Sequence, residues 1–426
     1  MKLRVALDQN FPVLSDAPGT VGKPLAVPSP CVDRACRTGR RCGMGRGVLL
    51  VLGWLAVAGC DAGPTSVDAS ADARGDGSAR DDSGGARDSG VDGGRDAGPW
   101  PCPSAADCVV QLTTGWAHTC ALRASGTVLC WGLGAYGQLG DGRPTHSDCA
   151  TSAGELVDCS RAPVAVTGLT DAVEVRAGAY FTCARRISGA VVCWGYNGHA
   201  ELGDGGMLHA WCAGGIDCSV APVAVRGLTE AVELGAGSSH VCARRRSGEV
   251  VCWGDGSLGQ IGNGGMTAAL VPAVVDGLTD AIELSVNGAL SCVRRAAGGV
   301  VCWGQNAAAQ LGDGVPVHES CASPTGGRID CSSVPVTVAD LGDATRLAVG
   351  IGHACALRST GAVACWGANE SGQLGDGSFV HPACTGGSDC SPTPVAASGA
   401  MDVVEVTGGG SFTCARRAAS TVDCWG

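Results

Sequence analysis

A cysteine pair spaced by nine residues and followed by Trp-Gly recurs through most of the chain and constrains its fold more than any other feature. The pattern C-x9-C-W-G begins at six positions, Cys120, Cys183, Cys242, Cys292, Cys355 and Cys414. The steps between copies are 63, 59, 50, 63 and 59 residues, so a block of three copies spanning 172 residues is used twice. A period of this kind indicates a repeat architecture in which each copy is one structural unit.

Each copy predicts four short strands. One copy reads "PVAVTGL", "DAVEVRAG", "FTCARR" and "GAVVCWG", which are apolar runs separated by Gly or Pro. Such runs predict strands. Four-stranded sheets repeated without helices are typical of a β-propeller, where the radial repetition protects the sheet edges. We therefore expect an all-β propeller of six recognisable blades over residues 101–426.

The hairpin segments also resemble a known family. "CALRASGTVLCWGLGAYGQLGDG" and "CARRISGAVVCWGYNGHAELGDG" are similar to the repeat of the regulator of chromosome condensation (RCC1) family, with its strand-Trp-Gly, its "GQLG" turn and its following "PV" strand. The resemblance covers residues 109–426 in six copies. Propellers of the family commonly have seven blades, and the first blade here, from "VVQLTTG", lacks a clear "PVxV" strand. Two alternatives therefore remain: a seven-bladed ring truncated after Gly426, or a six-bladed or open ring.

The cysteines predict a disulfide framework. Excluding Cys31, Cys36, Cys42 and Cys60 leaves 22 cysteines in the repeats, an even number at regular spacing in a chain with an export signal. Six cross-strand bridges are expected within the hairpins, pairing Cys120 with Cys130, Cys183 with Cys193, Cys242 with Cys252, Cys292 with Cys302, Cys355 with Cys365, and Cys414 with Cys424. Five local bridges are expected elsewhere, pairing Cys102 with Cys108, Cys149 with Cys159, Cys212 with Cys218, Cys321 with Cys331, and Cys384 with Cys390.

Four loops between blades share a second pattern, in which His precedes the first loop cysteine by three residues and Asp-Cys-Ser closes the loop. One His, two Cys and one Asp would suit zinc, but oxidised cysteines cannot bind it as thiolates. We therefore predict no metal and no cofactor. As contact residues in the loops we single out His146, His209, Trp211, His318, Phe379 and His381.

The chain before the repeats has the organisation of an exported lipoprotein. The segment "GVLLVLGWLAVAG" is short and apolar, follows three arginines and precedes Cys60, as in a secretory signal. "VAGC" resembles the lipobox of bacterial lipoproteins, and this resemblance makes Cys60 the lipid anchor. Met44 is a candidate start, which would leave residues 1–43 untranslated, with the signal at 44–59. Residues 60–100, rich in Asp, Gly, Ser and Ala, are predicted to be a disordered tether.

Charge and motif content narrow the function. Residues 101–426 carry 17 Arg against 28 Asp and Glu and no Lys, so the domain should repel nucleic acid. No Ser-His-Asp set or phosphate-binding glycine loop stands outside the repeat, which predicts a protein that is not an enzyme. Guanine-nucleotide exchange, an activity of nuclear family members, does not suit an acidic exported chain.

We therefore expect a monomeric binding module, lipid-anchored in the bacterial cell envelope and in contact with the membrane through its anchor alone. Its loops, which leave equivalent points of the blades, should bind a protein or a polysaccharide with one face of the propeller. The alternative is an inhibitor of a secreted hydrolase, because some secreted bacterial proteins that resemble this family inhibit enzymes. A propeller glycosidase or lyase is the least favoured interpretation.

Overall fold

The computed structural model describes residues 108–151, 154–206, 209–212, 215–323, 326–378, 380–381, 384 and 388–426. The predicted signal segment, the tether, Cys60 and Cys102 lie outside the described residues, and so does Phe379. Within the described part of the chain, no helix is long and apolar enough to cross a membrane.

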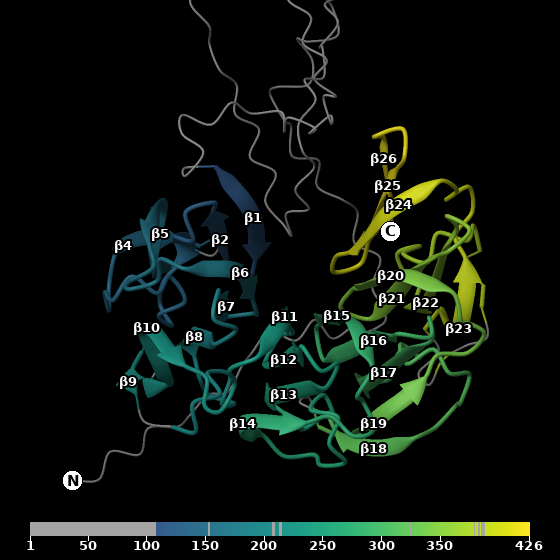
Figure 1. Cartoon of the computed structure of the whole chain (residues 1–426), viewed down its shortest axis with the longest axis horizontal. Helices are drawn as coiled ribbons and strands as arrows, with labels where there is room; N and C mark the ends of the chain where they lie inside the picture. The colour runs from purple at the N-terminus through teal and green to yellow at the C-terminus, as the bar shows by residue number, and fades with distance from the viewer. Residues whose placement is uncertain are drawn as a thin grey trace, which may run out of the picture.

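Six antiparallel sheets follow one another along the chain and are arranged as the blades of a propeller (Figure 1). The first sheet contains β1 (Val109–Thr114), β2 (His118–Arg123), β3 (Val128–Leu133), β5 (Leu156–Ala165) and β4 (Ser147–Ala150) in that spatial order. The second contains β6 (Ala172–Ala177), β7 (Phe181–Arg186), β8 (Val191–Tyr196), β10 (Asp217–Ala224) and β9 (Ala210–Trp211). The third contains β11 (Ala231–Ala236), β12 (His240–Arg245), β13 (Val250–Gly254) and β14 (Ala269–Val274).

The second half of the ring repeats this plan. The fourth sheet contains β15 (Ala281–Asn287), β16 (Leu290–Arg295), β17 (Val300–Gln305), β19 (Arg328–Thr337) and β18 (Glu319–Ala322). The fifth contains β20 (Ala344–Val349), β21 (His353–Arg358), β22 (Val363–Ala368) and β23 (Cys390–Ala396). The sixth contains β24 (Val403–Gly408), β25 (Thr413–Arg417) and β26 (Val422–Trp425).

The structure corrects the predicted position of the "PVxV" strand. This strand does not begin a blade but forms the outer strand of the blade whose Cys-Trp hairpin precedes it, as β5 pairs with β3 through Val164 and Cys130. The first blade therefore has its "PVxV" strand, contrary to the prediction. The sixth sheet is the one described with three strands. The sequence pattern alone did not show to which neighbour an outer strand would pair.

The six hairpins place their cysteines directly opposite each other, on the second and third strands of each blade. All six expected cross-strand pairs form disulfides, with Cα atoms 4.0–4.1 Å apart. The bridges join Cys120 to Cys130, Cys183 to Cys193, Cys242 to Cys252, Cys292 to Cys302, Cys355 to Cys365, and Cys414 to Cys424. Apart from Trp131 and Trp425, the tryptophans that follow the second cysteines are fully buried. The hairpin is therefore the covalently fixed centre of each blade.

The repeat tryptophan joins each blade to the one before it. The indole nitrogen of Trp303 donates to the carbonyl oxygen of Gln260 in the preceding blade, at 3.0 Å. Gly262 lies against the same indole with a φ of +77°, and a Cβ atom there would come within 2.7 Å of the indole nitrogen. The repeated "LG" turn is thus required by the tryptophan of the next blade. The apolar clusters likewise combine residues of neighbouring blades.

Acidic side chains on the inner strands form a second connection between blades. Glu283 accepts a hydrogen bond from Arg294 in its own blade at 2.8 Å and another from the backbone N–H of Leu347 in the next blade at 3.0 Å. Glu405, at the same position in the sixth blade, pairs with Arg416, but its side chain is 63% exposed. In Figure 1, β24 and β1 do not lie side by side, and among the described residues no backbone N–H of another blade bonds the Glu405 carboxylate.

Candidate binding face

Four long connections leave the ring at the same point of their blades. They follow the third strands β3, β8, β17 and β22 and lead to the outer strands. The strands are antiparallel, so the end of β3 lies beside the start of β2, with Gly132 opposite His118. The connections therefore emerge on the edge of the ring that also carries the turns between first and second strands. We call this edge the loop face.

Each of the four connections contains a disulfide bridge. The structure brings together Cys149 and Cys159, Cys212 and Cys218, Cys321 and Cys331, and Cys384 and Cys390, with Cα atoms 5.8–6.0 Å apart. Cys108 is also disulfide-bonded, while its predicted partner Cys102 lies outside the described residues. The connection between β13 and β14 contains no cysteine. The four loops are thus held close to the blades from which they leave.

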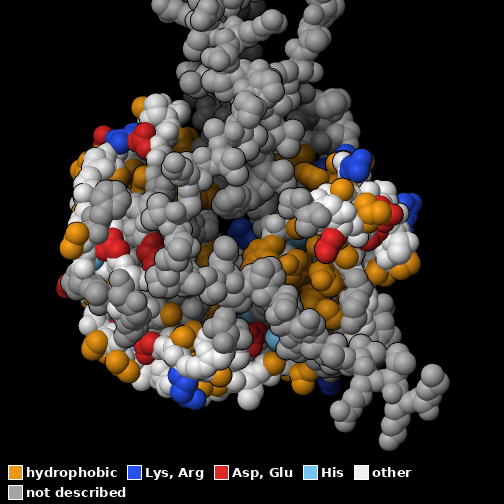
Figure 2. Space-filling view, turned by 180° about the vertical axis from the view of Figure 1, so that it is seen from behind, with side chains coloured by type: hydrophobic (Ala, Val, Ile, Leu, Met, Phe, Trp, Pro, Cys, Tyr) orange, Lys and Arg blue, Asp and Glu red, His pale blue; other side chains and the backbone are white. Residues whose placement is uncertain are grey.

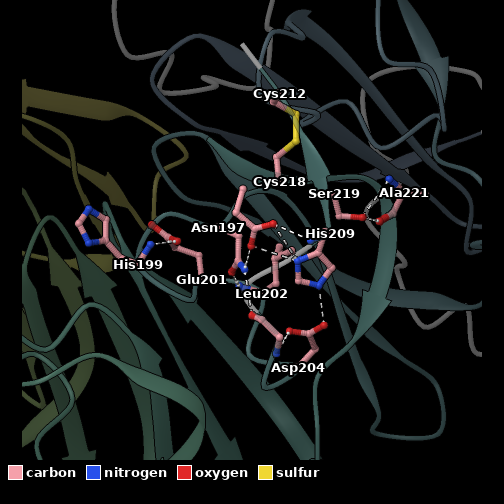
Figure 3. A network of polar contacts seen from close by, with 12 residues as sticks. Asn197, His199, Glu201, Leu202, Asp204, His209, Cys212, Cys218, Ser219 and Ala221 are labelled. Atoms are coloured by element: carbon pink, nitrogen blue, oxygen red, sulfur yellow. Dashed lines mark hydrogen bonds and ion pairs between the residues drawn. A yellow bond between two sulfur atoms is a disulfide. The ribbon is translucent and has the colours of Figure 1, made fainter. Parts of the chain in front are cut away.

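In every disulfide-closed loop the histidine lies between two aspartates, as Figure 3 shows for the second blade. Nε2 of His209 lies 2.7 Å from Asp204, which belongs to the "LGDG" turn, and Nδ1 lies 3.1 Å from Asp217, which precedes the second loop cysteine. Asp217 also accepts hydrogen bonds from the backbone N–H of His209 and from the Asn197 amide. The contacts connect the start, the middle and the end of the loop.

The other three loops have the same Asp-His-Asp arrangement. The first blade differs in having Gly134 where the other three have Asn, and a Cβ atom there would meet the carboxylate of Asp158. The three sets are Asp141, His146 and Asp158; Asp313, His318 and Asp330; and Asp376, His381 and Asp389.

This geometry favours the doubly protonated imidazolium. A neutral imidazole carries one N–H, whereas both ring nitrogens of His318 face a carboxylate within 3.1 Å. Burial by itself lowers the pKa of His318, but the hydrogen bonds and charges of Asp313 and Asp330 outweigh burial and raise the pKa above its usual value. The pKa values of His146, His209 and His381 are raised for the same reasons. Each loop is therefore held by an Asp-His-Asp triplet as well as by a disulfide, and the raised pKa shows that the triplet is stronger when the histidine is protonated.

The structure changes the interpretation of the predicted contact residues. The side chains of His146, His209, His318 and His381 are only 6–14% exposed, because the flanking aspartates enclose them. They hold the loops and are not available as surface contacts. Trp211 lies on the short strand β9, and Phe379 falls outside the described residues.

Three further histidines lie between blades rather than on the loop face. His118, His240 and His353 each place Nε2 within 2.9 Å of a hydroxyl of the following blade, on Thr182, Ser291 and Thr413 respectively. Burial lowers the pKa of each to about 4, so they are neutral. They contribute to packing between blades.

An aromatic cluster on the loop face was not found by the sequence analysis. It contains Trp116 and the only tyrosines of the chain, Tyr136, Tyr180 and Tyr196. The ring centroids of Trp116 and Tyr180 are 5.4 Å apart, those of Tyr180 and Tyr136 are 5.1 Å apart, and those of Tyr136 and Tyr196 are 5.7 Å apart. The confinement of all three tyrosines to the first two repeats was the signal that could have revealed it.

A buried acid lies beside this cluster. Glu201 occupies the position that Gln138, Gln260, Gln310 and Gln373 occupy in the other "GQLG" turns. Its Oε2 accepts the backbone N–H of His199 at 2.8 Å, whereas its Oε1 has no hydrogen-bond partner. Burial, together with the nearby Asp255 and Asp217, raises the pKa of Glu201 to about 8. The side chain is therefore a neutral carboxylic acid at pH 7.

A cavity of about 500 Å³ lies at the centre of the ring. It is lined by the inner strands and by the turns that follow them, including Trp116, Arg176, Glu233, Glu283 and Asn287. These turns belong to the loop face. Figure 2 shows a hollow at the centre of the ring, with hydrophobic side chains gathered beside it over the first two blades. The aromatic cluster, the cavity and the fixed loops therefore share one face.

Comparison with known proteins identifies the repeat. Two models of the regulator of chromosome condensation (RCC1) repeat match the chain, one at residues 109–138, 172–201, 231–260 and 344–373, and the other at residues 125–185 and 360–416. The chain carries RCC1 repeats. The first model covers four of the six hairpins, and these lie in both halves of the 172-residue duplication.

Relatives of known name share the repeats over part of their length. The chain is 31% identical to the human E3 ubiquitin-protein ligase HERC2 over 158 residues, which is 36% of this chain and 3% of the ligase. It is 30% identical to the mitochondrial RCC1 domain-containing protein RUG3 of Arabidopsis thaliana over 164 residues, which is 37% of this chain and 33% of that protein. The chain thus matches a third or less of these relatives.

Solved structures share the RCC1 fold. Yeast RCC1 (Prp20) in its complex with Kap60 superposes with a TM-score of 0.58 at 21% identity, covering 75% of this chain and 70% of that one. Human WBSCR16 superposes with a TM-score of 0.53 at 19% identity, covering 71% of this chain and 70% of that one. At these identities the likeness shows the fold, an RCC1-type β-propeller.

Proposed function

We propose that this RCC1-repeat chain is a non-catalytic binding module that is tethered to the cell envelope and uses its loop face to bind a protein or a polysaccharide. The observation that carries the proposal is the convergence of four disulfide-closed loops, a central cavity and an aromatic cluster on one face. Concave, partly aromatic surfaces held on a rigid scaffold are the usual sites of recognition.

The rigidity of the loops supports binding rather than packing. Each loop is closed by a disulfide and by an Asp-His-Asp triplet, although the third blade pairs its outer strand β14 without either device. Fixing a loop before it binds reduces the ordering cost of association. Protein binding by the fold also has precedent, because Prp20p of Saccharomyces cerevisiae was solved with an account of its binding to Gsp1p and histones.

The experiment that tests the proposal compares the purified, oxidised chain with a variant whose four long connections are replaced by the short connection between β13 and β14. Both proteins are immobilised and exposed to envelope and secreted fractions of the source organism. We expect a component retained by the intact chain alone. Equal retention by both proteins, or retention by neither, would contradict a role for the four long connections of the loop face.

The tether is tested separately. Cys60 lies in the lipobox-like "VAGC" and would carry the lipid, so Cys60→Ser should release the chain from the membrane fraction into the soluble fraction. Incorporation of a labelled fatty acid into the unaltered chain and not into the variant would support the anchor. Unchanged membrane association of the variant would contradict it, without affecting the proposal for the loop face.

A further inference from the structure

The duplication of 172 residues provides an internal comparison for the aromatic cluster. The residues 172 positions after Trp116, Tyr136, Tyr180 and Tyr196 are, in the same order, Gly288, Ala308, Gly352 and Ala368. The strands that flank these positions pair in the same register in both halves. His118 in the first half and Leu290 in the second each lie opposite the glycine of the following Trp-Gly. The scaffold therefore forms without the aromatic rings, and their presence in one half requires another explanation.

The rings are accessible and offer unused hydrogen-bonding groups. Trp116 is 64% exposed, and the three tyrosines are half-buried. Among the described residues, no hydrogen-bond partner is found for the three phenol hydroxyls or for the indole N–H of Trp116. The cluster thus presents apolar ring faces alternating with polar edges. These phenol and indole groups have no partner within the described part of the protein, so they are available to bond the hydroxyls of a ligand in place of water.

The charge around the cluster disfavours ionic ligands. Burial and the nearby Glu201 raise the pKa of Tyr196 to about 12, so the phenol stays neutral, and Trp116 is uncharged. The chain as a whole carries a net charge of −11, which repels polyanions. The ring centroids lie 5.1–5.7 Å apart, so the rings pack on one another and do not form a cage that would enclose a cationic group.

The extent of the cluster disfavours a polypeptide. A protein interface of ordinary size buries about 1,600 Å² around an apolar centre. On the third blade, the positions equivalent to Trp116 and Tyr180 are Ser238 and Ser239. Among the described residues, the stacked rings therefore end at the second blade. A sugar ring, by contrast, combines an apolar C–H face with hydroxyl edges and is about the size of one aromatic ring.

We propose that the cluster of Trp116, Tyr136, Tyr180 and Tyr196 binds an uncharged polysaccharide, whose sugar rings stack on the exposed aromatic faces while their hydroxyls bond the phenol and indole groups. The inference rests on the proposed function and narrows it to one ligand class and to the first two blades.

The test measures binding of the purified, oxidised chain to three soluble uncharged polysaccharides, laminarin, a galactomannan and dextran, by affinity electrophoresis and calorimetry. We expect retardation by at least one of them. The double variant Tyr136→Ala and Tyr196→Ala copies the residues of the second half, and Trp116→Ala removes the most exposed ring; each should weaken binding about tenfold or more. Ile351→Ala is the matched control, because Ile351 is an exposed apolar residue of the same face and cavity in the other half.

Control measurements separate the outcomes. Unchanged melting temperatures of the variants show that lost binding is not lost folding. Binding that survives both cluster variants but disappears with the shortened loops would overturn the inference and leave the proposed function in place. No binding to any of the three polysaccharides would also overturn it; retention of an envelope protein by the loop face would then still support the proposed function, and retention of nothing would contradict both.

Discussion

Glu201→Gln tests whether the buried acid beside the aromatic cluster is protonated in the folded protein. The pKa of Glu201 is raised from 4.5 to about 8, so between these values the folded protein keeps a proton that the unfolded chain releases. Stability must therefore fall as the pH rises through this window. At about 1.4 kcal/mol per pKa unit, the loss reaches about 3 kcal/mol at pH 7 and approaches zero near pH 4. Glutamine has the same shape and does not titrate.

The assay is thermal unfolding of the oxidised chain from pH 4 to pH 9, followed by tryptophan fluorescence. Glu201→Gln should raise the melting temperature by about 5–10 °C at pH 8 and leave it nearly unchanged at pH 4. The reciprocal control is Gln373→Glu, 172 positions away, where Oε1 accepts the N–H of Ser371 as Glu201 accepts that of His199. This variant should lose stability at pH 8 and not at pH 4.

A pH-independent effect of Glu201→Gln would contradict a raised pKa of Glu201, because it would mean that packing rather than protonation distinguishes the two side chains. The same conclusion would follow if both reciprocal variants shifted the melting temperature in one direction.

Three further predictions concern the scaffold and the loops. Glu283→Ala should cost about 2–4 kcal/mol, because it leaves Arg294 and a backbone N–H of the next blade unpaired, while Glu405→Ala at the exposed equivalent position should cost under about 1 kcal/mol in the same unfolding assay. Because the pKa of His318 is raised, its triplet stabilises the folded protein fully below pH 6.5, and this stabilisation is lost as the pH rises through the raised pKa. Hydrogen exchange in this loop should therefore accelerate with pH beyond the intrinsic rate. Replacing both Cys292 and Cys302 by Ala should cost about 2–4 kcal/mol, and an unchanged denaturation midpoint would contradict the structural role of the hairpin bridge.

The local parts of the fold could be predicted from the sequence. The spacing of Cys292 and Cys302 predicts a hairpin with its cysteines opposed, and the structure has that register. The assignment of the "PVxV" strand to a blade could not be made in the same way, because it depends on which of two neighbouring hairpins the strand joins after a long connection. The role of the repeat tryptophan is also non-local, since its indole bonds the preceding blade.

The loop histidines show where a sequence signal was present but was not used. His318 follows Asp313 by five residues, and the same spacing holds in all four disulfide-closed loops. The third connection lacks the histidine, and its turn carries Asn263 in place of Asp. The joint absence of both residues indicates a contact between them. The burial of the imidazole, which rules out a surface role, required the structure.

A hydrogen-exchange footprint of the purified chain, with and without its bound ligand, shows directly whether the loop face is the recognition surface. We expect protection in the connections that follow β3, β8, β17 and β22 and in the turns that precede β2 and β7. Protection confined to the opposite edge of the ring, at the hairpin turns between the second and third strands such as residues 124–127, would contradict it.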